Sequence, residues 1–88
     1  MPERSVQIIN KEGLHARPAA AIVKISAKFQ SEVTISRDGQ DVNAKSIMGV
    51  MMLVAECGAT LVLRAEGADA DPALDALVAL IQNKFGEK

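Results

Sequence analysis

The chain has 88 residues, of which 49% are hydrophobic, and its formal net charge is −1. This length and composition predict one globular domain over residues 1–88, because two separate cores would each be too small to fold alone. The near-neutral charge and the absence of Trp and Tyr argue against a nucleic-acid partner, which needs a basic surface and aromatic stacking platforms.

The chain also lacks sequence signals for a membrane or for metal binding. No apolar stretch approaches the roughly 18 residues that span a bilayer, and the first five residues lack the apolar run of a signal peptide. Cys57 is the only cysteine, so the chain can form neither an internal disulfide nor a cysteine-based metal site. We therefore expect a cytoplasmic protein that is not inserted in a membrane and holds no metal.

The first part of the chain predicts a strand, a loop and a helix. A strand over 4–9 places the apolar Val6 and Ile8 on one face. The polar connection that follows ends at Gly13, which suits a position of unusual backbone geometry. Apolar residues then recur at helical spacing from 16 to about 27, and Pro18 is tolerated only in a first helical turn.

The middle of the chain predicts two more strands and a short helix. A strand over 32–36 and a return strand over 41–43 flank Asp38-Gly39, a strong hairpin-turn signal, and the short return strand suits a sheet edge. A helical segment over 45–56 follows, with Ser46 as its N-cap and Cys57-Gly58 as its stop. Its apolar run is too continuous for one buried stripe, so part of it should face solvent or a partner.

The last third predicts a strand over 60–66 and a long helix. Asp71 is the expected N-cap of that helix, Pro72 lies in its first turn, and Lys84 lies in its last turn. Its apolar face comprises Leu74, Leu77, Val78, Ile81 and Phe85. The element order βαββαβα indicates an α+β sandwich with helices on one face of an antiparallel sheet.

His15, the only histidine, is the leading candidate for chemistry. Pro18 places it at or beside the N-cap of the first helix, where free amides and the helix dipole disfavour a protonated ring. The amides of Ala16 and Arg17 and the Arg17 guanidinium could then hold a phosphoryl group attached to a neutral, nucleophilic imidazole. On this chemistry alone, a capping or solvated histidine is the more common outcome at such a position.

Ser46 also has two readings. As an N-cap it needs no further function. A phosphate added there would nevertheless meet free N–H groups at a helix start, and it would place a dianion beside the Met48, Met51 and Met52 cluster.

Two segments together resemble a known family. Gly13-Leu14-His15-Ala16-Arg17-Pro18 resembles the active-site signature of the HPr family, the histidine-containing phosphocarriers of the bacterial phosphotransferase system. Lys45-Ser46-Ile47-Met48-Gly49 resembles the family's second signature, around a regulatory serine. The spacing, the length and the element order fit as well. The resemblance implies an open-faced β-sandwich with three helices on one face of a four-stranded antiparallel sheet.

The resemblance implies a phosphoryl relay protein, not an enzyme, that needs no cofactor. His15 would accept a phosphoryl group on Nδ1 from enzyme I and pass it to a histidine of an enzyme IIA domain, with Arg17 steadying the group. Ser46 would be a phosphorylation site for a serine kinase/phosphorylase and would thereby engage regulatory proteins. The implied docking surface for both relay partners comprises Ala16, Ala20, Lys24, Ile47, Met48 and Met51. We expect a monomer.

Three alternatives stay open at this point. The carrier could serve sugar uptake or the related nitrogen-type regulatory branch. A purely regulatory role could rest on phosphorylated Ser46. A small acylphosphatase-like enzyme, with Arg17 as a phosphate clamp, would have a similar element order.

Overall fold

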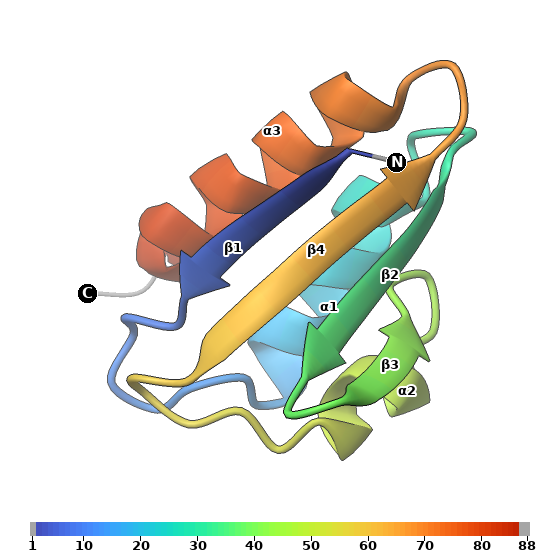
Figure 1. The fold of residues 1–88 in the computed structure, drawn as a ribbon. Helices are drawn as coiled ribbons and strands as arrows, with labels where there is room; N and C mark the ends of the chain where they lie inside the picture. The colour runs from blue at the N-terminus through green and yellow to red at the C-terminus, as the bar shows by residue number, and fades with distance from the viewer. Residues whose placement is uncertain (1, 87–88) are drawn as a thin grey trace.

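An open antiparallel sheet organises the molecule, for which the computed structural model describes residues 2–86. Its strands are β1 (Glu3–Gln7), β2 (Glu32–Arg37), β3 (Gln40–Asn43) and β4 (Thr60–Glu66), in the order β1-β4-β2-β3. The helices α1 (Ala16–Ser26), α2 (Ile47–Met52) and α3 (Ala70–Gln82) cover one face, and the other face is open (Figure 1). The predicted open-faced βαββαβα sandwich is confirmed.

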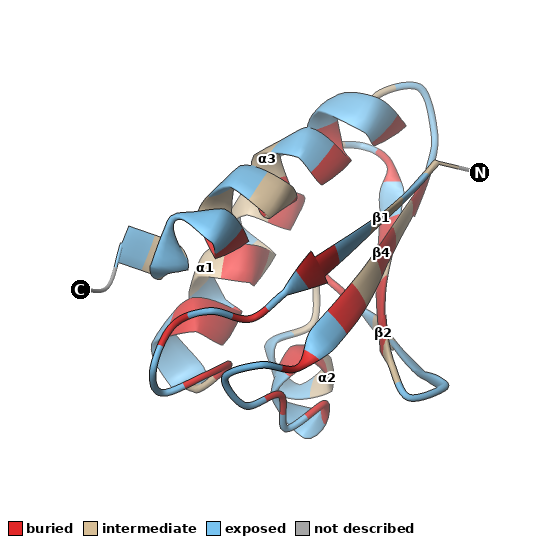
Figure 2. Cartoon of the chain, turned by 60° about the vertical axis from the view of Figure 1, so that its left-hand side comes forward, coloured by how far each residue is buried: buried red, intermediate tan, exposed pale blue. Residues whose placement is uncertain are grey.

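The core forms because strand residues alternate between the two faces of the sheet. On β4, which spans the predicted residues 60–66, Leu61, Leu63 and Ala65 point inward and are buried. They pack under the apolar faces of α1 and α3, and buried positions of helices and strands face one another across the core (Figure 2). Each fully buried leucine or isoleucine in such a core contributes about 1.5–3 kcal/mol.

The β2–β3 hairpin turns as the sequence predicts. Asp38 and Gly39 both have positive φ, 50° and 84°. Positive φ at both central residues is typical of a type I′ turn, whose twist matches that of the two strands. β3 pairs only with β2 among the described strands and forms one edge of the sheet.

The second helix is shorter than predicted. α2 ends at Met52 rather than near residue 56, because Val54 adopts a left-handed backbone (φ 48°). The Arg37 guanidinium donates hydrogen bonds to the carbonyl oxygens of Leu53 (3.2 Å) and Val54 (2.5 Å). A distant side chain therefore satisfies the helix end, and Cys57-Gly58 lies in a later turn instead of forming the stop.

Three predictions for the last helix are also wrong, one of them being Phe85, which lies beyond the end of α3 with a φ of 55°. The N-cap of α3 is Asp69, not Asp71, and Asp71 lies in the first turn. The Asp69 carboxylate accepts hydrogen bonds from the backbone N–H groups of Gln30 (2.9 Å) and Ser31 (2.8 Å). These contacts, which are distant in sequence, fix Asp69 as the N-cap residue. Lys84 does not belong to the last turn, because α3 ends at Gln82 and Lys84 opens a short 3₁₀ segment, Lys84–Gly86.

Candidate functional site

The start of α1 presents an uncapped helix end. His15 is its N-cap residue, with an extended backbone (φ −88°, ψ −168°), and its carbonyl oxygen accepts the first helical bond, from Ala19 N–H (3.0 Å). Pro18 is buried at the third helical position, where the missing N–H costs no hydrogen bond. The His15 side chain does not cap the helix, so the amides of Ala16 and Arg17 remain available to an anion.

The loop before His15 is held rigidly. The Asn10 side-chain amide donates to the Gly13 carbonyl (2.7 Å), and the Gly13 N–H donates to the Asn10 carbonyl (3.1 Å). Leu14 N–H donates to the Ala55 carbonyl (2.7 Å), which pins the loop to the segment after α2. Gly13 has a φ of 71°, and a Cβ there would lie 2.6 Å from the Ala55 oxygen, so only glycine fits. His15 thus projects from a fixed platform.

The His15 ring is accessible at this platform. Its side chain is 33% exposed, and its Nε2 lies 3.5 Å from the Glu12 carboxylate. Both side chains border a shallow hollow of about 210 Å³, whose far wall is the segment from Val54 to Glu56. A partner can therefore reach the ring from outside without any rearrangement of the backbone.

Arg17 makes the helix start basic. It is exposed, and the first turn of α1 contains no acidic residue. Within residues 2–86, Arg17 forms no ion pair or side-chain hydrogen bond. The two residues after His15 therefore offer an exposed guanidinium and two backbone amides that no helical bond uses, groups suited to hold a doubly charged phosphoryl group.

Arg37, which the sequence interpretation did not single out, supports the far wall of the hollow. Besides its two bonds to backbone carbonyls, it pairs with the Glu56 carboxylate at 2.7 Å. A hydrogen bond from the Glu56 backbone and, next, this guanidinium hold the pKa of the Glu56 carboxyl below its ordinary value. No local pattern could have revealed this role, because Arg37 is 16–19 residues from its partners.

Ser46 and the predicted docking residues occupy the α1–α2 side of the molecule. Ser46 caps α2 as predicted, with its Oγ accepting a hydrogen bond from Gly49 N–H (3.2 Å). All the predicted docking residues are exposed, and the two helices that carry them pack together. The exposed apolar surface also extends to Met52 (62%) and Val54 (72%), which the prediction omits.

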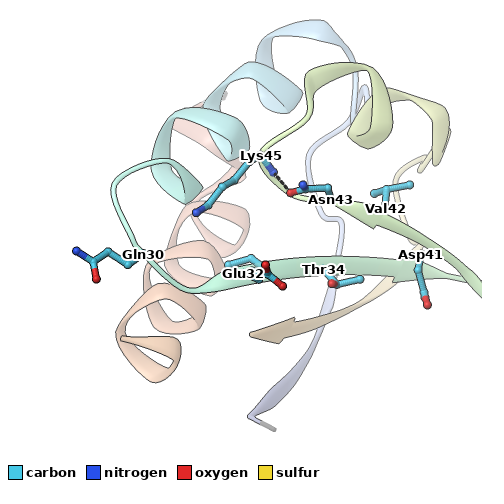
Figure 3. Close-up of a pocket in the computed structure, with 8 residues that line it drawn as sticks. Gln30, Glu32, Thr34, Asp41, Val42, Asn43 and Lys45 are labelled. Carbon is cyan, nitrogen blue, oxygen red and sulfur yellow. Dashed lines mark hydrogen bonds between the residues drawn. The ribbon is translucent and has the colours of Figure 1, made fainter. Parts of the chain in front are cut away.

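Another hollow lies away from these residues. It measures about 600 Å³ and is bordered by β2, β3 and Lys45 (Figure 3). The Lys45 ammonium donates a hydrogen bond to the Phe29 carbonyl oxygen (2.9 Å), and the Lys45 backbone N–H donates one to Asn43 Oδ1 (2.8 Å). None of the predicted phosphotransfer or docking residues borders it.

Membrane and metal features are absent from the described part of the chain. No helix within residues 2–86 is long and apolar enough to cross a bilayer. The same residues contain no group of three or more His, Cys, Asp or Glu side chains placed to hold a metal ion.

Comparison with known proteins covers nearly the whole chain. A family model described as PTS-HPr, "PTS HPr component phosphorylation site", matches residues 2–83. The phosphocarrier protein HPr of Cupriavidus necator is 53% identical over 87 residues, which are 99% of this chain and 98% of that protein. A crystal structure of HPr from Thermoanaerobacter tengcongensis superposes with a TM-score of 0.96 at 50% identity, covering 100% of this chain and 99% of that one. A second structure from that organism, an HPr dimer, has a TM-score of 0.80 at 50% identity, covering 99% and 100%.

Proposed function

The chain belongs to the HPr family of the phosphotransferase system, and on that premise we propose that His15 relays a phosphoryl group. It accepts the group on Nδ1 from the phosphohistidine of enzyme I and passes it to a histidine of an enzyme IIA domain. The observation that carries this proposal is the accessible His15 ring at an uncapped helix start beside Arg17. Family membership favours this carrier role over an acylphosphatase-like enzyme.

The chemistry needs little from the carrier beyond position and charge. The Nδ1 lone pair attacks phosphorus, the bond between phosphorus and the donor's ring nitrogen breaks, and its electron pair returns to the donor's ring. The amides of Ala16 and Arg17 and the guanidinium then receive the charge of the phosphoryl oxygens. Donor, carrier and acceptor all hold the group on a histidine, so each transfer is nearly balanced in free energy and reversible.

The exposed side of α1 and α2 is the proposed docking surface for both partners. It comprises Ala16, Ala20, Lys24, Ile47, Met48 and Met51. Met48 is 74% exposed, and a flexible thioether chain can adapt to two different partner surfaces. We propose that the carrier works as a cytoplasmic monomer and uses this surface for one partner at a time.

Phosphorylation of the purified chain by enzyme I and phosphoenolpyruvate tests the carrier role. Intact-mass measurement should find one added phosphoryl group that is lost in acid. The His15→Ala variant should fold normally, because the ring is partly exposed and makes no cap, and it should take up no phosphoryl group. Full labelling of His15→Ala would refute the assignment.

A regulatory role for Ser46 is the second candidate, favoured by its place beside the exposed Met48. A phosphate on Ser46 would put a dianion next to the proposed docking surface and should slow phosphorylation by enzyme I. We expect Ser46→Asp to slow this transfer severalfold and Ser46→Ala to leave it unchanged, at a cost of about 1 kcal/mol in stability from the lost cap. Equal rates for Ser46→Asp and the wild type would count against the regulatory role. The choice between sugar uptake and the nitrogen-type branch depends on which enzyme IIA accepts the group.

A further inference from the structure

Glu12 contacts the reactive ring from the preceding loop. Its Oε2 lies 3.5 Å from His15 Nε2, three residues along the chain. We propose that Glu12 is a positioning residue that holds the ring proton on Nε2, so that Nδ1 presents the lone pair to the incoming phosphorus. This inference rests on the proposed function and adds to it the reason why one ring nitrogen is the nucleophile.

The backbone places Glu12 between fixed points. The reciprocal bonds between Asn10 and Gly13 close the turn on either side of it, and the bond from Leu14 to Ala55 fixes the turn against the neighbouring segment. Gly13 and Ala55 approach so closely that the turn has no room to shift toward that segment. The carboxylate therefore projects from a defined position, although the side chain itself is 74% exposed.

A carboxylate can influence the ring because a neutral imidazole has one N–H donor and one acceptor nitrogen. An ionised carboxylate accepts hydrogen bonds and cannot donate one. At 3.5 Å the contact is electrostatic, and the negative charge beside Nε2 favours the tautomer with the proton on Nε2 and the lone pair on Nδ1. Carboxylates beside the rings of metal-bound histidines likewise fix which nitrogen carries the proton.

The same contact assists the ring after transfer. When Nδ1 forms its bond to phosphorus and the donor's N–P bond breaks, the proton on Nε2 stays in place and the ring becomes positively charged. The Glu12 carboxylate then faces that charge, so no proton has to leave during the transfer. It sits at the Nε2 edge of the ring, away from the phosphoryl group on Nδ1.

The other charged groups around the hollow do not take this role. Glu56 borders the same hollow, but its carboxylate is paired with Arg37 at 2.7 Å. Arg17 does not line the hollow, and as a cation it cannot stabilise a proton on the ring. Among the described residues that line this hollow, Glu12 is thus the carboxylate placed to act on the ring.

The tautomer can be measured directly by ¹⁵N NMR of the imidazole nitrogens in the unphosphorylated protein. Wild type should give one protonated nitrogen signal, at Nε2, and one unprotonated signal, at Nδ1. Glu12→Gln and Glu12→Ala should move both signals toward each other, because the two tautomers then mix. Glu66→Gln is the matched control, since this exposed carboxylate lies at the opposite end of the sheet, and it should leave the signals unchanged.

Phosphotransfer from enzyme I gives the second measurement. Both Glu12 variants should reduce kcat about two- to fivefold, the range expected for an exposed charge contact, while KM stays near the wild-type value. The inference is overturned if the variants keep the wild-type tautomer or the wild-type kcat. If wild type itself takes up no phosphoryl group, the proposed function fails, and the NMR signals still decide whether Glu12 sets the tautomer.

Discussion

The starts of α1 and α3 lie at opposite ends of the molecule (Figure 1). Their first turns carry charges of opposite sign. At α1, the first turn contains no acidic residue and holds the exposed Arg17. At α3, the N-cap is Asp69 and the first turn contains Asp71, which complements the positive end of the helix dipole.

The charges at the α3 end are satisfied within the protein. Asp71 pairs with Arg4 at 3.0 Å, Asp75 approaches the same guanidinium at 3.5 Å, and Asp69 holds the backbone before β2. The α1 end lacks any such carboxylate on its own first turn. The acids of the chain therefore neutralise the start of α3, whereas the start of α1 keeps its positive end for the phosphoryl group that we propose it holds.

The largest expected effect comes from removing the cation of the α1 end. Arg17→Ala should slow phosphorylation of His15 about ten- to a hundredfold, because the phosphoryl oxygens lose a charged hydrogen-bond donor. The rate of enzyme I-dependent labelling measures it. Arg4→Ala is the matched control at the α3 end: it should cost at most about 1 kcal/mol in stability and leave the rate unchanged. Equal rate losses in the two variants would show that the charge at the start of α1 has no special role in phosphotransfer.

Adding an acidic residue to the first turn of α1 should stabilise the helix and slow phosphotransfer. Ala16→Glu places a carboxylate in the first turn, which should raise the free energy of unfolding by about 0.3–1 kcal/mol. The same charge should slow phosphotransfer about tenfold by repelling the phosphoryl group. Ala16→Gln controls for size on the docking surface and should retain most of the activity. If both variants lose activity equally, the loss is steric and the electrostatic account of this helix start is wrong.

Local patterns predict the elements and the position of His15 well. The alternation of Leu61, Leu63 and Ala65 predicts the bounds of β4, and Pro18 predicts where α1 begins. Both signals act within a few residues, so no tertiary contact is needed to interpret them. Ser46 as the N-cap of α2 follows from the same kind of local chemistry.

The features that escape prediction depend on contacts between distant segments. The end of α2 follows from Arg37 on β2, and the N-cap of α3 follows from the hydrogen bonds that Asp69 accepts near residue 30. The contact of Glu12 with His15 is an exception, since three residues separate them and their spacing could have suggested it. The sequence alone does not predict this contact, because it depends on the geometry of the turn, which is set by the close approach of Gly13 to Ala55.

The smallest expected effect tests whether the negative charge of Asp69, at the start of α3, stabilises the fold. Hydrogen bonds from the Ser31 side chain and from the Gln30 and Ser31 backbone hold the pKa of the Asp69 carboxyl below its ordinary value of 3.8. A lowered pKa stabilises the fold above that ordinary value, and this contribution is lost as the pH falls through the lower folded value. Asp69→Asn should therefore be less stable than wild type at pH 7, and the difference should shrink below about pH 4.

Urea unfolding at pH 7, 4 and 2.5 measures this dependence, with Asp75→Asn as the control. Asp75 is 71% exposed and its contact with Arg4 is long, so its removal should change stability little at any pH. Phosphorylation of His15 in Asp69→Asn should stay at the wild-type rate, because the α3 start lies at the far end of the molecule. A stability difference that persists unchanged to pH 2.5 would mean that shape, and not charge, makes Asp69 the N-cap; a slowed phosphorylation would mean that the two helix starts are not independent.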